Sequence, residues 1–140
     1  MKKKIKSRVS DKIININDQA VKTFFEERAK KALPHKYNYV IYQDDHPELA
    51  IQRDEYEKKF ILEKIYINDG IKILDIGCGV GRWADAFVNY NIGKYVGTDI
   101  CSEFLQIAQE SLDTYGGGQV CFYSVLFSGC NRKIKNIQTS

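Results

Sequence analysis

The stretch Leu74-Asp75-Ile76-Gly77-Cys78-Gly79-Val80-Gly81-Arg82-Trp83 decides how this chain folds. It includes the end of a short, largely apolar run from Ile71 to Ile76, which predicts a buried parallel strand. Gly77, Gly79 and Gly81 then allow a sharp turn, because glycine tolerates positive φ and has no side chain to obstruct a ligand. The sequence therefore predicts a strand that ends in a ligand-binding loop.

Strands and helices alternate after this loop. We expect a helix over residues 82–90, a second strand from Tyr95 to Asp99, a helix capped by Ser102, and a third strand from Val120 to Val125. This βαβαβ order is half of a doubly wound parallel sheet of the α/β class. Ligands of such sheets bind at the carboxyl ends of the strands.

Two helices are expected before the first strand. Apolar spacing predicts one from Asp18 to Leu33, with Asn17 or Asp18 as its N-cap, and another from Pro47 to about Tyr66. The expected inner side of the second helix carries Leu49, Tyr56, Phe60, Ile61 and Ile65. We divide the chain into a helical arm or lid, residues 1–66, and a partial ligand-binding domain, residues 67–140.

The glycine pattern narrows the choice of ligand. A dinucleotide fingerprint, GxGxxG, would need glycine where this chain has Arg82, and no P-loop is present. Asp99 ends the second strand, 20 residues beyond Gly79. In doubly wound folds an acidic residue at this place accepts hydrogen bonds from ribose hydroxyls.

The pattern DxGxGxG, followed by Asp99, resembles the first motifs of class I S-adenosylmethionine-dependent methyltransferases, which have a Rossmann-like fold. The resemblance implies S-adenosyl-L-methionine as the cofactor, with the backbone of residues 77–81 along the ligand and Asp99 on the ribose. It also implies that Asp75 faces the methionine amino group, that Ile100 packs on adenine, and that Arg53 is a candidate for the methionine carboxylate. The expected cofactor-binding set is Asp75, Gly77, Cys78, Gly79, Gly81, Arg82, Asp99, Ile100 and Arg53.

The activity implied by the resemblance is methyl transfer to an oxygen or nitrogen of a small-molecule acceptor. No catalytic residue is assigned. Four side chains are candidates for contact with the acceptor, although each can also be structural: Tyr37, Tyr39, Tyr42 and His46. One alternative is a non-catalytic remnant that binds S-adenosylmethionine and transfers nothing; another, an NAD-dependent oxidoreductase, is disfavoured by Arg82.

The family's sheet has seven strands in the order 3-2-1-4-5-7-6, and only strands 1 to 3 can be located in this sequence. We therefore expect a truncated form of the fold. Its first strand would have an open edge through which the chain self-associates. The family also places an acidic residue near the end of the third strand, where this chain has Ser124 and Val125.

Composition excludes several other classes. Apolar residues make up 44% and charged residues 28% of the chain, as in ordinary globular proteins. The sequence has no apolar run of about 18 residues and no signal-peptide core, so we expect a cytoplasmic protein without a membrane span. The first 40 residues hold 11 basic and 4 acidic side chains, interpreted as a solvated tail, so nucleic acid is not an expected partner. The four cysteines form no CxxC pair, so we expect reduced thiols and no metal site.

Overall fold

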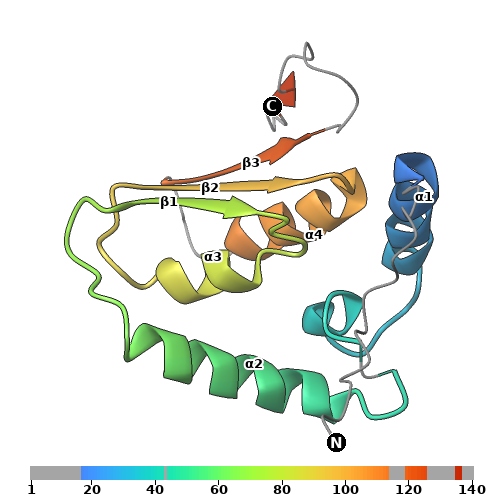
Figure 1. Cartoon of the computed structure of the whole chain (residues 1–140), viewed down its shortest axis with the longest axis horizontal. Coiled ribbons are helices and arrows are strands. Elements are labelled where there is room, and N and C mark those ends of the chain that lie inside the picture. Colours follow the sequence, from blue (N-terminus) through green and yellow to red (C-terminus); the bar gives the residue numbers. More distant parts are fainter. Residues whose placement is uncertain (1–16, 43, 114–118, 126–134, 137–140) are drawn as a thin grey trace, which may run out of the picture.

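The computed structural model describes residues 17–42, 44–113, 119–125 and 135–136. Three helical elements precede the sheet (Figure 1): α1 (Asp18–Ala29), the 3-10 turn η1 (Lys36–Tyr39) and α2 (Glu48–Leu62). Strands and helices then alternate in the expected way through β1 (Lys72–Ile76), α3 (Arg82–Phe87), β2 (Lys94–Asp99), α4 (Ser102–Asp113) and β3 (Val120–Ser124). A two-residue strand that was not expected, β4 (Lys135–Asn136), follows β3.

The sheet has the strand order β1-β2-β3-β4. Strands β1, β2 and β3 are parallel, and the two-residue β4 pairs antiparallel with β3. The register places Leu74 beside Val96 and Val96 beside Cys121. The predicted fold class, a partial Rossmann-like α/β sheet preceded by helices, is confirmed. Within the described residues, β1 pairs only with β2 and forms one edge of the sheet.

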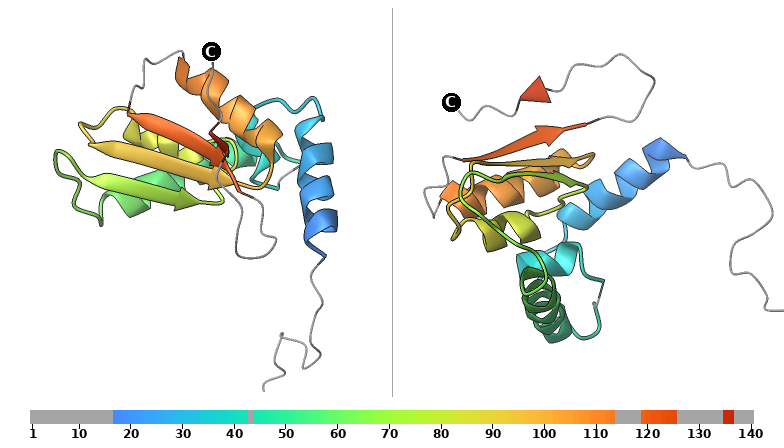
Figure 2. Two further views of the ribbon diagram at one scale, coloured as in Figure 1. Left: turned by 90° about the horizontal axis from the view of Figure 1, so that it is seen from above. Right: turned by 60° about the vertical axis from the view of Figure 1, so that its left-hand side comes forward.

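The described helices of the β-α-β units cover one face of the parallel strands and leave the other without helices (Figures 1 and 2). We call these the covered face and the bare face. On the covered face, Ile73, Tyr95 and Phe122 pack into the main hydrophobic core with side chains of α3 and α4. On the bare face, Leu74 is 63% exposed and Ile76 is 71% exposed. Alternation along each strand thus separates core residues from exposed ones.

Several helix ends differ from the sequence-based expectation. Asn17 caps α1 as predicted, its side chain accepting from the N–H of Ala20, but the helix ends at Ala29, before the proline-restricted Leu33. Helix α2 ends at Leu62 instead of Tyr66, and α3 ends at Phe87 instead of residue 90. Ser102 is the first residue of α4 and donates to Glu103, so the prediction that it caps the helix is wrong.

The predicted inner side of α2 is also wrong. Five apolar side chains expected to be buried are exposed: Leu49, Tyr56, Phe60, Ile61 and Ile65. The buried residues of α2 are instead Ala50 and Asp54. The physical reason is that two acids of α2, Asp54 and Glu57, form ion pairs with Arg82 of α3, and the spacing of apolar residues does not reveal such pairs. No helix in the described part of the chain is long and apolar enough to cross a membrane.

Candidate functional site

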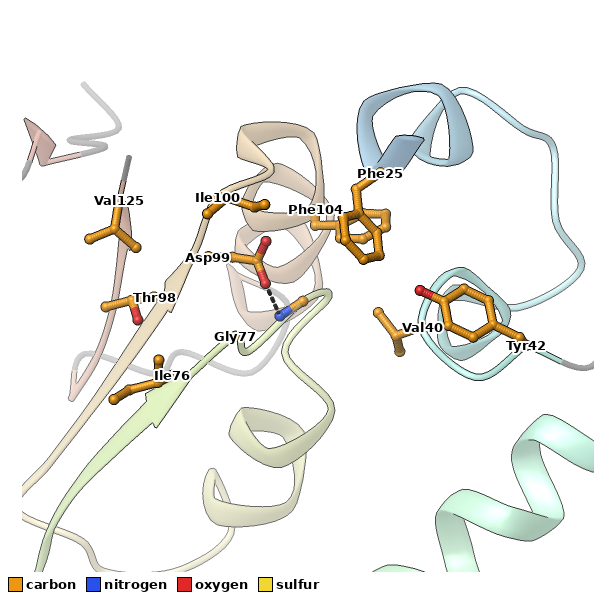
Figure 3. A pocket seen from close by; sticks show the side chains of 11 residues that line it. Phe25, Val40, Tyr42, Ile76, Gly77, Thr98, Asp99, Ile100, Phe104 and Val125 are labelled. Carbon is orange, nitrogen blue, oxygen red and sulfur yellow. Dashed lines mark hydrogen bonds between the residues drawn. The ribbon is translucent and has the colours of Figure 1, made fainter. Parts of the chain in front are cut away.

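A cavity of about 360 Å³ lies at the carboxyl ends of β1 and β2, where the crossover connections begin. A volume of this size suits a small-molecule ligand. Residues from both halves of the chain line it, as Figure 3 shows: Phe25, Val40, Tyr42, Ile76, Gly77, Gly79, Thr98, Asp99, Ile100, Phe104 and Val125. The lining is mostly apolar, with a few polar groups at the strand ends.

The glycine loop forms the floor of this cavity. Gly77, Gly79 and Gly81 have φ values of 76°, 54° and 77°, a backbone conformation that side chains with a Cβ rarely adopt. The N–H groups of Gly77 and Cys78 donate to the carbonyl oxygen of Thr98 at 2.8 and 3.0 Å. The start of the loop is thereby fixed to β2, and no heavy atom would meet a Cβ placed at Gly77, which leaves space beside the backbone.

Asp99 joins the loop to the next helix. Its Oδ2 accepts from the N–H of Gly79 at 2.8 Å, the dashed line in Figure 3, and its Oδ1 accepts from the N–H of Cys101 at 2.9 Å. Each carboxylate oxygen has two lone pairs, so each can accept one further hydrogen bond. The carboxylate is therefore positioned by backbone donors and still able to bind a pair of hydroxyl groups.

Side chains from the N-terminal part of the chain form the opposite wall. Phe25 of α1 packs edge-on against Phe104 of α4, with ring centroids 5.9 Å apart. Val40 lies so close to the loop that a Cβ on Gly79 would come within 2.6 Å of its Cγ1. Tyr42 lies beyond Val40 at the mouth of the cavity (Figure 3). The loop at Gly79 is therefore restricted both by its φ and by this wall.

Arg28 holds the wall in place. Its side chain is buried and donates to the carbonyl oxygens of Asn38 and Tyr39 at 2.6 and 2.8 Å, and to both oxygens of Asp44. Hydrogen bonding to this guanidinium lowers the pKa of Asp44. The same guanidinium lies 4.6 Å from the ring centroid of Tyr42. One arginine thus ties α1 to the segment that carries Val40 and Tyr42.

Among the four candidates for contact with an acceptor, the structure brings Tyr42 to the cavity. Tyr37 donates to Asp85, Tyr39 donates to the carbonyl oxygen of Lys31, and His46 lies at the surface beside Glu48. Burial raises the pKa of Tyr42; the Arg28 guanidinium opposes this shift, and Asp99 and Asp44 add to it. A phenol with a raised pKa keeps its proton at neutral pH, so Tyr42 can donate a hydrogen bond.

The structure separates the expected cofactor-binding residues into two groups. Four of them line the cavity, namely Gly77, Gly79, Asp99 and Ile100, and five do not, namely Asp75, Cys78, Gly81, Arg82 and Arg53. Asp75 accepts a hydrogen bond from the buried hydroxyl of Tyr95. Cys78 is buried, with its Sγ against Gly97, and burial, followed by the charges of Asp99 and Asp75, raises its pKa. A protonated, buried thiol fits a packing role.

The two arginines of the expected set, Arg82 of α3 and Arg53 of α2, both form ion pairs with acidic side chains of α2. Arg82 donates to Asp54 at 2.7 Å and to Glu57 at 2.8 Å, and Arg53 donates to Glu57 at 2.6 Å. Neither guanidinium reaches the cavity in this structure. The described residues also contain no group of three or more His, Cys, Asp or Glu side chains able to hold a metal ion.

Much of the cavity lining was not identified from the sequence as a ligand site. Phe25 and Phe104 belong to the apolar stripes of their helices, and Val40 stands in the polar, aromatic-rich segment between two helices. Local patterns assign such residues to a core or a loop. The number of aromatic residues between 37 and 42 was a signal that this segment packs on something, but not on what.

Comparison with known proteins agrees with this geometry. Residues 73–126 match the family model described as a methyltransferase domain. That segment includes β1, the glycine loop, β2 with Asp99, and β3. The chain has no match among curated proteins.

The chain is also similar to solved structures. Phosphoethanolamine N-methyltransferase 1 of Haemonchus contortus, solved with phosphoethanolamine and S-adenosylhomocysteine, matches with a TM-score of 0.60 and 20% identity, over 75% of this chain and 20% of that chain. YcgJ of Bacillus subtilis matches with a TM-score of 0.47 and 24% identity, over 51% of this chain and 30% of its own. YjhP of E. coli matches with a TM-score of 0.47 and 16% identity, over 73% and 36%.

This chain thus spans between 20% and 36% of the length of these three solved chains. Residues 73–126 thus match a methyltransferase domain, and the parallel sheet fits a partial Rossmann-like fold, in agreement with the resemblance to class I S-adenosylmethionine-dependent methyltransferases.

Proposed function

We propose that the chain binds S-adenosyl-L-methionine in the cavity at the carboxyl ends of β1 and β2, and that its activity is methyl transfer to an oxygen or nitrogen of a small-molecule acceptor. The observation that carries the proposal is the hydrogen bond between Asp99 and the N–H of Gly79, which brings the glycine loop and the acidic strand end to one cavity. The loop and the acid were expected to act together, and this bond joins them directly.

The residues present fit the cofactor. Gly77 leaves open space beside its backbone, where a ligand can approach. Asp99 keeps one free lone pair on each oxygen for the two ribose hydroxyls. Ile100, Phe104 and Val125 supply an apolar surface for a flat ring, and Val125 stands near the position where the family carries an acid. When bound, the cofactor supplies a methyl group on sulfonium that is already electrophilic.

The protein's own contribution is to orient ligands and exclude water. Phe25 and Val40 close one side of the cavity with apolar surface. Tyr42 keeps its hydroxyl proton at neutral pH and can donate a hydrogen bond to an acceptor molecule at the mouth. We assign no general base, because the described part of the cavity has no histidine or second carboxylate in its lining. An acceptor that is already a free amine or an ionised hydroxyl needs none.

We also propose that the other residues of the expected set contribute to the site when the cofactor is bound. Asp75, Cys78 and Gly81 support the loop from the covered face, and the arginines Arg53 and Arg82 would have to leave their partners on α2 to reach a ligand. We also propose that the chain self-associates through β1, because the outer side of this strand has no partner within the described sheet and exposes Leu74 and Ile76.

Calorimetric titration of the 140-residue chain with S-adenosylhomocysteine and, separately, with NAD tests the binding proposal. We expect a saturable signal with the first and none with the second. Gly79→Val should abolish binding and leave the helical circular dichroism unchanged, because valine resists positive φ and its Cβ would collide with Val40. Tight binding of NAD, or no binding of S-adenosylhomocysteine by the parent chain, would contradict the proposal.

A second measurement separates an enzyme from a non-catalytic binding protein. Transfer of label from methyl-labelled cofactor to a panel of small amines, alcohols and phenols should be lost in Asp99→Ala. Binding of the cofactor without transfer to any acceptor would favour the non-catalytic alternative. Binding and transfer are thereby tested independently.

A further inference from the structure

Helix α2 is attached to the rest of the molecule through a buried carboxylate. Asp54 is only 3% exposed, although most large apolar side chains of the same helix are exposed, with Leu62 at its end packed on the main core. Its Oδ1 accepts from Arg82 Nε at 2.7 Å and its Oδ2 lies 2.7 Å from Lys58 Nζ. Both oxygens are thus paired with cations, as a buried carboxylate requires.

Arg82 connects this carboxylate to the glycine loop. It is the first residue of α3 and follows Gly81, which has a left-handed backbone conformation. Its Nη2 also donates to Glu57 at 2.8 Å, so two acids of α2 hold one planar guanidinium. The start of the loop is fixed to β2 by Thr98 and Asp99, whereas its exit is fixed by these side chains of α2.

A second connection runs from the same carboxylate to the opposite wall of the cavity. Lys58, the other partner of Asp54, donates to the hydroxyl of Tyr37 at 3.0 Å and lies 4.5 Å from its ring centroid. Tyr37 in turn donates to Asp85 of α3 at 2.7 Å. Tyr37 belongs to η1, and the chain leads from η1 directly to Val40 and Tyr42, which line the cavity.

Asp54 therefore stands where the supports of both cavity walls meet. One partner leads to the glycine loop and the other to the segment that carries Val40, the side chain nearest to Gly79. No residue of α2 belongs to the described cavity lining, so any effect of this helix on a ligand is transmitted through other residues.

We propose that Asp54 is a positioning residue for the cofactor site: acting through Arg82 and Lys58, it sets the spacing between the glycine loop and the N-terminal wall. This inference depends on the proposed function, since it presupposes that the cavity binds S-adenosylmethionine. It also gives Arg82 a role different from the expected direct contact. In this structure Arg82 is paired with Asp54 and Glu57 and lies outside the cavity lining, where it can support the exit of the loop.

The test is the affinity of the full chain for S-adenosylhomocysteine, measured well below the melting temperature. Asp54→Asn keeps the size of the side chain and removes its charge. We expect a Kd about tenfold higher than in the parent chain, a change of about 1.4 kcal/mol. Arg82→Lys should have a similar effect because it loses the planar fork. Glu55→Gln, which removes one negative charge at an exposed position of the same helix, is the matched control and should leave the Kd unchanged.

A double variant separates positioning from general stability. If Asp54 acts on the site through Arg82, Asp54→Asn combined with Arg82→Lys should bind no more weakly than either single variant. Trp83, the only tryptophan, adjoins Arg82 and reports on the loop exit by fluorescence. Its emission in the ligand-free protein should shift in Asp54→Asn and not in Glu55→Gln.

The outcomes are distinct. A parent chain that does not bind S-adenosylhomocysteine overturns the proposed function, and this inference with it. A parent that binds, together with Asp54→Asn that is folded and binds equally well, overturns only the positioning role, as does strict additivity in the double variant. If Asp54→Asn fails to fold, the affinity of Glu57→Gln for S-adenosylhomocysteine is measured in its place. This variant leaves the buried pair intact, so a Kd raised about twofold supports the role and an unchanged Kd overturns it.

Discussion

The covered and bare faces of the three parallel strands carry comparable apolar side chains but bury them very differently. Tyr95 and Phe122 on the covered face are 0% and 4% exposed, whereas Leu74 and Ile76 on the bare face remain mostly in solvent. A largely apolar strand sequence indicates that other parts of a protein pack on both faces of that strand. It does not indicate which segment, or which second chain, supplies that cover.

The largest effect should separate the two faces by stability. Phe122→Ala removes a side chain that packs against Tyr95 and fills the space above Gly97, and should lower the free energy of unfolding by about 3–5 kcal/mol. Leu74→Ala removes apolar surface that is already exposed and should change it by less than about 0.5 kcal/mol. Urea denaturation followed by circular dichroism measures both variants.

Comparable losses in these two variants would mean that the bare face is covered in solution. The oligomeric state should then be measured under the same conditions. If Leu74→Ala is destabilising only at high protein concentration, the cover is a second copy of the chain.

The next effect concerns two carboxylates that both project from the covered side of the sheet. Asp99 lines the cavity and Asp75 is paired with Tyr95. Asp99→Ala should weaken binding of S-adenosylhomocysteine by about 1.5–3 kcal/mol, because the ribose hydroxyls lose a charged acceptor. Asp75→Asn should weaken it less. Titration calorimetry gives both values, and equal affinities for the parent and both variants would show that the carboxyl ends of these strands are not the ligand site.

A smaller effect is expected on self-association. Leu74→Lys places a charge on the exposed edge strand and should raise the dissociation constant between copies about tenfold, or about 1.4 kcal/mol. Phe60→Lys, on the exposed side of α2, is the control and should leave association unchanged. Sedimentation velocity over a range of concentrations measures both. A parent chain that stays monomeric would contradict self-association. Association that is weakened by Phe60→Lys instead would place the interface on α2.

The elements best predicted from the sequence are those with strong local signals. The order strand, glycine loop, helix, strand, helix, strand is present as expected, because each step is marked by apolar runs and glycines within a few residues. Asp99 was placed at the strand end by its spacing from the loop alone, and it lies beside Gly79. The proximity of the loop and the acidic strand end was therefore predictable without a structure.

The N-terminal half was harder to predict because its packing is polar and long-range. The buried side of α2 is defined by Asp54, whose partner Arg82 is 28 residues away, and periodicity of apolar residues cannot detect such a pair. The wall at Val40 depends on Arg28, a charged residue that a helical pattern assigns to solvent but that is buried by hydrogen bonds to backbone carbonyls. Buried arginines and aspartates are visible only once their partners are placed.

The smallest effect should come from chemical modification of the three described cysteines, Cys78, Cys101 and Cys121, which differ in how far they are buried. Cys121 shares the bare face with Val96 and is partly exposed, whereas Cys78 and Cys101 are buried. Burial raises the pKa of Cys101 from 9.0 to about 11 and raises that of Cys78 as well, so both thiols stay protonated at pH 8. Among these three cysteines, iodoacetamide at pH 8 should therefore modify Cys121 first, with a change in the free energy of unfolding below about 0.5 kcal/mol. Because the folded state holds the Cys101 proton more tightly than the unfolded state does, stability should be intact below pH 9 and fall as the pH rises toward 11. Peptide mapping of the native protein measures the order of modification, and labelling of Cys101 as fast as Cys121 would show that the cluster of Cys101, Val80 and Phe104 opens readily.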